Sequence, residues 1–141
     1  MQKLYFSIDI KAQREKVWKV LWEDATYRDW TSVFAEGSHA KSDWKEGGRI
    51  EFLDPSGDGM IAVIDKLVPN EFMSFKHLGE IREGKEQPWD EGAGGMENYT
   101  LKENGEYTAL TVDLDSPEEY RDMFEDIFPK ALERVKELAE A

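Results

Sequence analysis

The chain has 141 residues, enough for one domain with a buried core, and 40% of them are hydrophobic, which excludes a disordered protein. Thirty-one acidic residues outweigh eighteen basic ones, so the formal net charge of −13 disfavours nucleic acid as a partner, and the absence of cysteine excludes disulfides and cysteine-ligated zinc. No apolar run reaches the ~18 residues of a membrane span and no signal peptide is recognisable. We therefore expect a cytoplasmic protein with a single domain over residues 1–141.

The first part of the chain predicts a strand followed by two short helices. Residues 3–10 alternate between apolar and polar side chains, as in a half-buried strand. Residues 12–22 carry an apolar stripe at helical spacing. Trp30 and Phe34 continue at that spacing, and Asp24 suits the N-cap of a second short helix.

From residue 39 onward the apolar side chains recur with a period of two, which is typical of strands. Turn-forming residues interrupt these segments at 46–48, 54–59, 69–70 and 104–105. About six or seven consecutive strands in this order favour one antiparallel sheet.

The end of the chain predicts one long amphipathic helix. Ser116-Pro117-Glu118-Glu119 combines an N-cap serine, a proline at the first helical position and a capping-box glutamate. Apolar residues from Tyr120 to Leu138 follow a three-four spacing. Pro129 lacks an amide donor, so a kink or a short break is expected there.

Four segments resemble a known family in their order and spacing: IDIKAQREKVWKVLW (8–22), Trp30, VIDKLVPNEFMSFKH (63–77) and FPKALERVKEL (128–138). They are similar to the helix-grip proteins of the START-like (SRPBCC) superfamily, in particular to the branch of the activator of Hsp90 ATPase C-terminal domain. The resemblance implies an α+β fold, with two short helices after the first strand and a long C-terminal helix packed across a curved antiparallel sheet. Members bind lipids, hormones or polyketides, a few act on them chemically, and many have no known ligand.

A curved sheet that grips a helix leaves a gap, which is either a packed core or a ligand cavity. The residues expected to converge there are large and mostly aromatic: Trp30, Phe34, Trp44, Phe52, Phe75, His77, Trp89, Met96, Tyr99, Met123, Ile127 and Phe128. We predict that they line a small cavity for a hydrophobic molecule. A packed aromatic core explains the same residues and stays the alternative.

His77 shares a face with Met73 and Phe75 in the alternation of EFMSFKH, so it is expected to face the interior. There it would orient a ligand together with Tyr99 and Asn98, or act as the general base of a cyclase- or hydrolase-type enzyme. The sequence around His77 shows no spacing typical of a catalytic partner. We therefore assign no catalytic residue and favour a binding protein over an enzyme.

The glycine-rich segment 77–101 is predicted to form a mobile flap at the mouth of the cavity, with Trp89 tucked inward. The acidic residues of this segment near Trp89 are Asp90, Glu91 and Glu97. In a glycine-rich loop such acids are expected to be solvated and not tuned apart for acid–base chemistry.

DPSGDG, residues 54–59, has the oxygen spacing of the first half of a calcium-binding EF-hand loop. Its strand-like flanks favour a hairpin turn instead, so we expect no metal and no cofactor. A third functional hypothesis, suggested by the family name, is a chaperone-associated interaction domain whose acidic surface faces a basic partner. The expected partner is thus a small hydrophobic molecule or, failing that, a chaperone, and the chain is expected to be a monomer or a homodimer.

Overall fold

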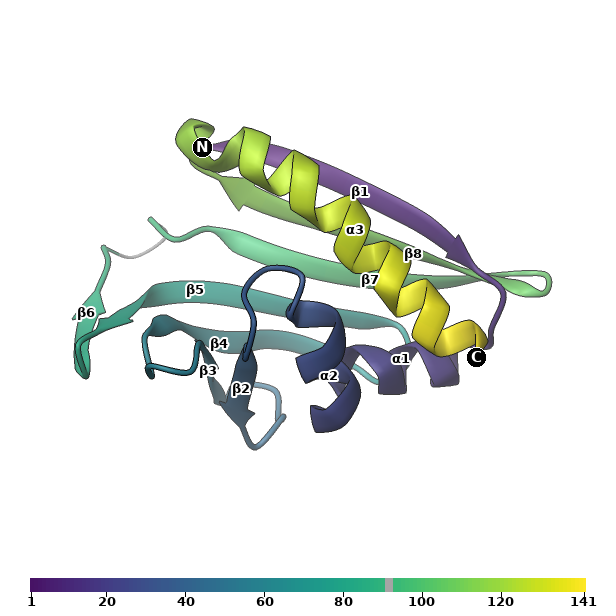
Figure 1. Ribbon diagram of the computed structural model, residues 1–141, viewed down its shortest axis with the longest axis horizontal. Coiled ribbons are helices and arrows are strands. Elements are labelled where there is room, and N and C mark those ends of the chain that lie inside the picture. Colours follow the sequence, from purple (N-terminus) through teal and green to yellow (C-terminus); the bar gives the residue numbers. More distant parts are fainter. Residues whose placement is uncertain (91–92) are drawn as a thin grey trace.

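The computed structural model describes residues 1–90 and 93–141, which form an α+β fold (Figure 1). The elements in chain order are β1 (Gln2–Ile10), α1 (Arg14–Trp22), α2 (Asp24–Thr31), β2 (His39–Ser42), β3 (Arg49–Leu53), β4 (Gly59–Val68), β5 (Phe72–Arg82), β6 (Lys85–Pro88), β7 (Met96–Asn104), β8 (Tyr107–Ser116), the short 3-10 helix η1 (Glu118–Tyr120) and α3 (Arg121–Glu140). In the described part of the chain, no helix is both long enough and apolar enough to cross a membrane.

The strands form one antiparallel sheet in the order β1-β8-β7-β5-β4-β3-β2, and β6 pairs with β5 beside this path. The sheet is curved, α3 runs across it in front of β1 and β8, and α1 and α2 lie near the C-terminal end of α3 (Figure 1). The predicted arrangement of two short helices, a curved sheet and one long helix is confirmed. The sheet has an eighth strand, β6, within the segment 77–101 that the sequence assigned to a loop.

Strand pairing decides which side chains face α3. Leu4 of β1 pairs with Leu114 of β8, and both are buried in the main core. On β7, Glu97 lies opposite Leu114, and Tyr99 lies opposite the core residue Val112. Because side chains alternate along a strand, Glu97 and Tyr99 therefore both point to the concave, helix-covered face.

The long helix starts later than its sequence signal suggests. Ser116 is the last residue of β8, and its hydroxyl donates to the carbonyl oxygen of Pro117 at 2.9 Å instead of capping a helix. The predicted capping box is therefore wrong, and α3 begins at Arg121 after the short 3-10 helix. The helix then runs continuously through Pro129, so there is no break at this residue, while a kink there stays a prediction.

The C-terminal half of α3 is fastened to its neighbours by polar contacts. Arg134 donates two hydrogen bonds to the Asp29 carboxylate of α2, at 2.7 and 2.9 Å, and this ion pair lowers the pKa of Asp29. Lys136 donates to the carbonyl oxygen of Asp9 at the end of β1. The N-terminal half is less covered, since Met123 there is 44% exposed.

Candidate functional site

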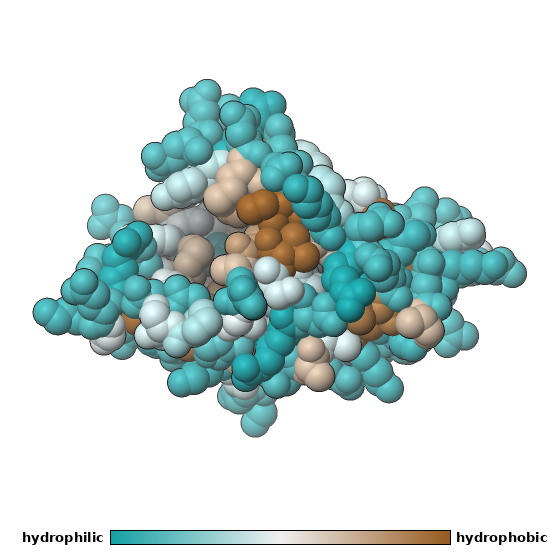
Figure 2. Space-filling model, viewed as in Figure 1, coloured by the Kyte–Doolittle hydropathy of each residue, from teal (hydrophilic) through white to brown (hydrophobic). Residues whose placement is uncertain are grey.

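An open hollow lies on the concave face beside the first half of α3. Figure 2 shows pale and brown surface inside this hollow and teal, hydrophilic surface around it. On α3, Phe128 stacks on Phe6 of β1 with ring centroids 5.0 Å apart and meets Phe34 edge-on at 4.9 Å. Phe6 and Phe34 are only half-buried. We call this hollow the concave cleft; the aromatic residues gathered around it are Phe6, Phe34, Phe52, Phe124 and Phe128.

The inner end of the region between sheet and helices is filled. The ring of Trp22 meets Phe75 at 5.4 Å and Tyr99 at 4.9 Å between centroids. Trp30 is 2% exposed, and its indole N–H donates to the carbonyl oxygen of Leu21 at 3.1 Å. These residues are thus part of a packed aromatic core that fills the inner part of the predicted cavity.

A chain of three polar side chains lies on the concave face next to this aromatic core. Glu97 Oε1 is 3.0 Å from His77 Nε2, and the Tyr99 hydroxyl donates to Glu97 Oε2 at 2.5 Å. His77 is 8% exposed, and its ring lies 6.0 Å from that of Phe52. The sequence indicated the inward direction of His77 but not its carboxylate partner.

The protonation states of this chain follow from its surroundings. Burial on its own would raise the pKa of Glu97. The hydrogen bond from His77, the positive charge that this ring carries when it is protonated, and the hydrogen bond from Tyr99 outweigh burial, so the pKa lies below its ordinary value. Burial and the nearby Glu97 carboxylate raise the pKa of Tyr99 well above its ordinary value. At neutral pH Glu97 is therefore an anionic acceptor, and Tyr99 is a protonated donor.

The second ring nitrogen of His77 is unsatisfied. Nδ1 is buried and has no hydrogen-bond partner in the described part of the chain. When the neutral ring donates from Nε2 to Glu97, Nδ1 carries a lone pair and can only accept. A buried polar atom without a partner costs about 1–3 kcal/mol, so a ligand group that donates to Nδ1 would recover that free energy.

Trp89 lies close to His77, and its inward position over a cavity stays a prediction. Its backbone N–H donates to the carbonyl oxygen of Leu78 at 2.8 Å, and its side chain is half-buried. A Cβ atom on Gly94 would lie 2.8 Å from Trp89 Cε3 and 2.8 Å from His77 Cβ, so the glycine fits closely between them. Whether Trp89 moves as a flap stays a prediction.

The segment 77–101 is more regular than the sequence suggested, because its first half is a hairpin of β5 and β6. Glu97 was expected to be solvated, which is wrong, since it belongs to β7 and faces the core. Asp90 is exposed as expected, whereas Glu91 and Gly92 lie outside the described residues.

Three of the residues expected to line the cavity lie elsewhere. Met96 pairs with Lys76, next to the Glu97–Phe75 pair, so alternation directs it to the convex face. Met123 is largely exposed at the start of α3, and Trp44 lines a separate groove near α1. Ile127 is half-buried on α3. A cavity lined by Phe34, Phe52, His77, Trp89, Ile127 and Phe128 stays a prediction.

Sequence reasoning also missed residues that the structure brings to the cleft. The rings of Phe6 and Phe124 both contact the ring of Phe128. The strand alternation around Phe6 and the helical spacing around Phe124 had indicated only that the two residues belong to the hydrophobic core. The segment MENYTL could have indicated that the Glu97 side chain points inward. Tyr99 and Leu101, two and four residues further along, lie on the same face of the strand as Glu97 and are largely apolar.

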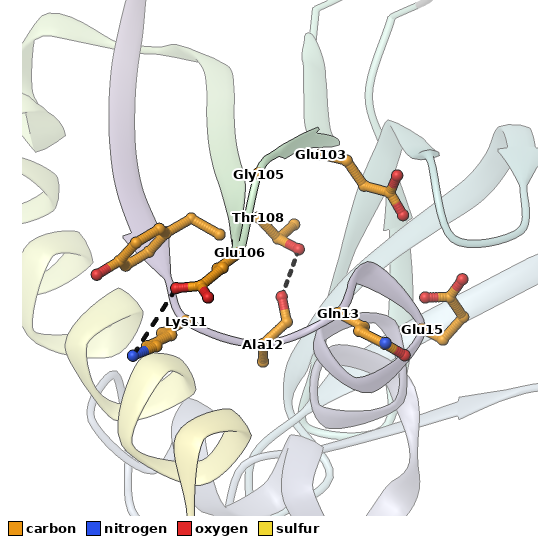
Figure 3. A pocket seen from close by; sticks show the side chains of 9 residues that line it. Lys11, Ala12, Gln13, Glu15, Glu103, Gly105, Glu106 and Thr108 are labelled. Carbon is orange, nitrogen blue, oxygen red and sulfur yellow. Dashed lines mark hydrogen bonds and ion pairs between the residues drawn. The ribbon is translucent and has the colours of Figure 1, made fainter.

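Another hollow, with a volume of about 600 Å³, lies between the β1–α1 connection and the β7–β8 turn (Figure 3). Its lining is mostly polar: Lys11, Ala12, Gln13, Glu15, Glu103, Gly105, Glu106, Tyr107 and Thr108. Within it the Thr108 hydroxyl donates to the carbonyl oxygen of Ala12 at 2.7 Å, and Lys11 Nζ lies 4.0 Å from Glu106 Oε2. These four groups are thus partnered with one another, and the mostly polar lining does not favour a hydrophobic ligand.

The DPSGDG segment forms the turn between β3 and β4, as the strand-like flanks predicted. The Asp54 carboxylate accepts the backbone N–H groups of Ser56 and Asp58 at 2.9 and 3.2 Å. Among the described residues there is no group of three or more histidine and acidic side chains placed to hold a metal ion.

The family model described as Activator of Hsp90 ATPase homolog 1-like protein matches residues 11–140. The chain belongs to this family. The predicted resemblance is thereby confirmed, while no curated protein gives a sequence match.

Several solved structures share the fold of this activator of Hsp90 ATPase homolog 1-like protein. The Aha1 dimer from Colwellia psychrerythraea is 20% identical with a TM-score of 0.76, over 99% of this chain and 97% of that one. CV1439 from Chromobacterium violaceum is 17% identical with a TM-score of 0.72, over 100% and 99% of the two chains. DynU16, from the dynemicin biosynthetic locus, is 16% identical with a TM-score of 0.74; the match covers 100% of this chain but only 48% of DynU16. At such identities the likeness shows the fold alone.

Proposed function

We propose that the protein binds a small hydrophobic molecule carrying one hydrogen-bond donor, in the concave cleft. The observation that carries this proposal is the buried, unpartnered Nδ1 of His77 beside aromatic side chains. Ligand sites combine apolar walls, which supply affinity, with a few polar groups that fix orientation. His77 offers such a polar group, and Glu97 holds its ring in place through Nε2.

The packing around the cleft supports a small ligand. Because Trp30 and Phe75 are fully buried, the inner part of the concave face offers no further space. A ligand would lie against the half-buried rings of Phe34 and Phe52, with its polar end toward His77. The biosynthetic locus of DynU16 is consistent with a ligand of the secondary-metabolite kind.

Native mass spectrometry of freshly purified protein, before and after incubation with fatty acids, flavonoids and polyketide-like aromatics, tests the proposal. We expect a retained or added molecule at one-to-one stoichiometry. Binding should weaken in Phe34→Leu and in His77→Gln, whereas Tyr107→Leu, which removes an exposed ring of similar size elsewhere, should bind as the wild type does. Protein that takes up none of these molecules in any preparation contradicts the proposal.

Acid–base chemistry on the bound molecule is the second candidate function, and the Glu97–His77 pair favours it. A carboxylate that accepts from one ring nitrogen orients the imidazole and leaves the other nitrogen as a base. Once a ligand is identified, exchange of its acidic protons for deuterium is the assay. A catalytic role requires that His77→Gln abolishes this exchange under conditions that saturate the variant with ligand.

A chaperone-associated role stays a prediction suggested by the family description. Among the described residues, the exposed hydrophobic side chains belong to several elements and connections: Met1, Tyr5, Val68, Leu78, Tyr107, Tyr120 and Met123. An acidic surface that holds a basic partner would release it at high salt, so a pull-down insensitive to salt counts against this version.

A further inference from the structure

A second hollow, with a volume of about 270 Å³, lies between α1 and the ends of β4 and β5. We call it the tryptophan groove; its lining residues are Trp18, Lys19, Trp22, Glu23, Trp44, Leu67 and Met73. The ring of Trp22 separates it from the aromatic core, because Trp22 also meets Phe75 and Tyr99. The groove is thus distinct from the concave cleft.

Three indole rings of the tryptophan groove meet at angles that form a corner. Trp18 and Trp22 are inclined at 75° with centroids 6.1 Å apart, and Trp22 and Trp44 are inclined at 43° with centroids 5.8 Å apart. A flat aromatic ligand requires nearly parallel walls, which these rings do not provide. A compact, nearly spherical group that presents methyl groups on several sides fits such a corner better.

The backbone holds Trp44 in this corner at a conformational cost. Its φ angle is 56°, in the left-handed region that side chains other than glycine seldom occupy. The Trp44 N–H donates to Ser42 Oγ at 2.9 Å, and Glu46 Oε1 accepts the N–H of Leu67 on β4 at 3.0 Å. Strained residues of this kind persist only where their surroundings fix them, and they gather at ligand sites.

The indole faces of the tryptophan groove favour a cation. The faces of indole rings carry negative potential and attract ammonium groups within about 6 Å. The exposed carboxylate of Glu23 stands at the rim, and the chain as a whole carries a formal net charge of −13. Lys19 lines the same groove one helical turn from Glu23. Its ammonium group offsets the charge of Glu23, so the attraction for a cation comes mainly from the indole rings, and Lys19 suits an anionic group attached to the same ligand.

We propose that the tryptophan groove binds a quaternary ammonium group, the rounded cation that three inclined indole rings and one carboxylate accommodate best. Choline is the probe, and its neutral carbon isostere, 3,3-dimethyl-1-butanol, is the matched control ligand. The two have nearly the same shape, so a difference in their binding reports the charge.

Titrations followed by the indole N–H resonances of the protein test the proposal. Choline should shift the resonances of the groove tryptophans, and the isostere should bind about tenfold more weakly, as expected for the loss of a desolvated cation–π contact. Trp44→Leu should weaken choline binding by a similar factor, and Glu23→Gln by a smaller one. Tyr5→Leu, which removes an exposed ring on β1, is the control and should bind choline as the wild type does.

Equal affinities for choline and the isostere overturn the proposal, and so does the absence of any shift at about 10 mM choline. If Trp44→Leu does not fold, the comparison of ligands on the wild type and on Glu23→Gln still decides. None of these variants replaces a residue of the concave cleft, so this result is independent of the proposed function.

A quaternary ammonium group reaches a protein either free in solution or on a phosphatidylcholine headgroup. Sedimentation with phosphatidylcholine vesicles distinguishes the two sources. Cosedimentation that free choline competes away assigns the lipid headgroup, whereas choline binding without cosedimentation assigns a soluble ligand.

Discussion

Glu97 and His77 are joined across two neighbouring strands, with Glu97 Oε1 3.0 Å from His77 Nε2. The register of β5 and β7 pairs Glu97 with Phe75, so His77 lies two residues further along β5 on the same face. The Tyr99 hydroxyl donates a hydrogen bond to the other carboxylate oxygen of Glu97. The carboxylate therefore fixes the orientation of the imidazole, and Nδ1 is left for another partner.

The neutral imidazole of His77 is expected to carry its proton on Nε2, because Glu97 is an anionic acceptor at that nitrogen. Nitrogen-15 chemical shifts of the ring measure the tautomer directly. Glu97→Leu removes the acceptor and should abolish the preference for the Nε2-protonated form. Glu97→Gln keeps an oxygen acceptor and should partly retain it. A wild-type ring protonated mainly on Nδ1 contradicts the orientation described here.

Glu97 is also expected to contribute to unfolding at acidic pH. Its pKa is lower in the folded protein than its ordinary value of 4.5, so the folded state favours the carboxylate. The stabilisation is complete above the unfolded pKa and is lost as the pH falls through the folded pKa. The free energy of unfolding of Glu97→Gln should therefore fall less between pH 7 and about pH 3 than that of the wild type.

Urea unfolding at the two pH values measures this difference. Asp54→Asn is the control, because the pKa of Asp54 is lowered by its turn, mainly through the Ser56 hydroxyl, and not by the polar chain on the concave face. The control should reduce the acid sensitivity without changing the tautomer of His77. An acid sensitivity in Glu97→Gln that equals the wild type shows that His77 and Tyr99 do not stabilise the Glu97 carboxylate.

The sequence was sufficient for the order of elements because hydrophobic periodicity is local. The alternation of EFMSFKH placed His77 correctly on the buried face, and the spacing in α1 and α3 predicted both helices. The partner of His77 could not be predicted in the same way. β6 lies between β5 and β7 in the sequence, so the pairing of Glu97 with β5 joins residues that are far apart in the chain. The register of such a pair is fixed by long-range packing and not by the local sequence pattern.

Errors at the ends of elements have a similar physical origin. Ser116 and Pro117 are good helix-starting residues, yet the pairing of Gln2 with Ser116 keeps the strand intact to that point. The cross-strand hydrogen bonds and the buried position of Ser116 outweigh the local capping preference. Met96 was misplaced because one residue decides which face of a strand a side chain occupies.

Alanine substitutions of Phe75 and Phe52 should distinguish a residue of the packed core from a residue that lines the cleft. Phe75 is fully buried, so Phe75→Ala should lower the free energy of unfolding by about 3–5 kcal/mol. Phe52 is half-buried, and Phe52→Ala should cost roughly half of that or less, because the lost side chain buries less surface. Urea unfolding of both variants measures the two values. Equal costs would place Phe52 in the packed core and remove it from the cleft.

Gly94 is expected to govern the position of Trp89. A Cβ at residue 94 would lie 2.5 Å from the carbonyl oxygen of His77 and 2.8 Å from Trp89 Cε3. The backbone oxygen cannot yield easily, so in Gly94→Ala the indole and its connecting segment must shift. We expect a loss of about 1–3 kcal/mol in the free energy of unfolding and a red-shifted, more solvated tryptophan emission.

A double-mutant cycle isolates the contribution of the indole. Trp89→Ala removes the ring with which the new methyl group of Gly94→Ala would clash. Gly94→Ala should therefore lower the free energy of unfolding by less in the Trp89→Ala background than in the wild type. The contact with His77 remains in both backgrounds and cancels in the cycle. Additive costs would mean that the indole of Trp89 does not pack against residue 94 in solution. Ligand binding to the cleft should then be insensitive to Gly94→Ala, whereas coupled costs predict that this variant changes ligand affinity together with the emission of Trp89.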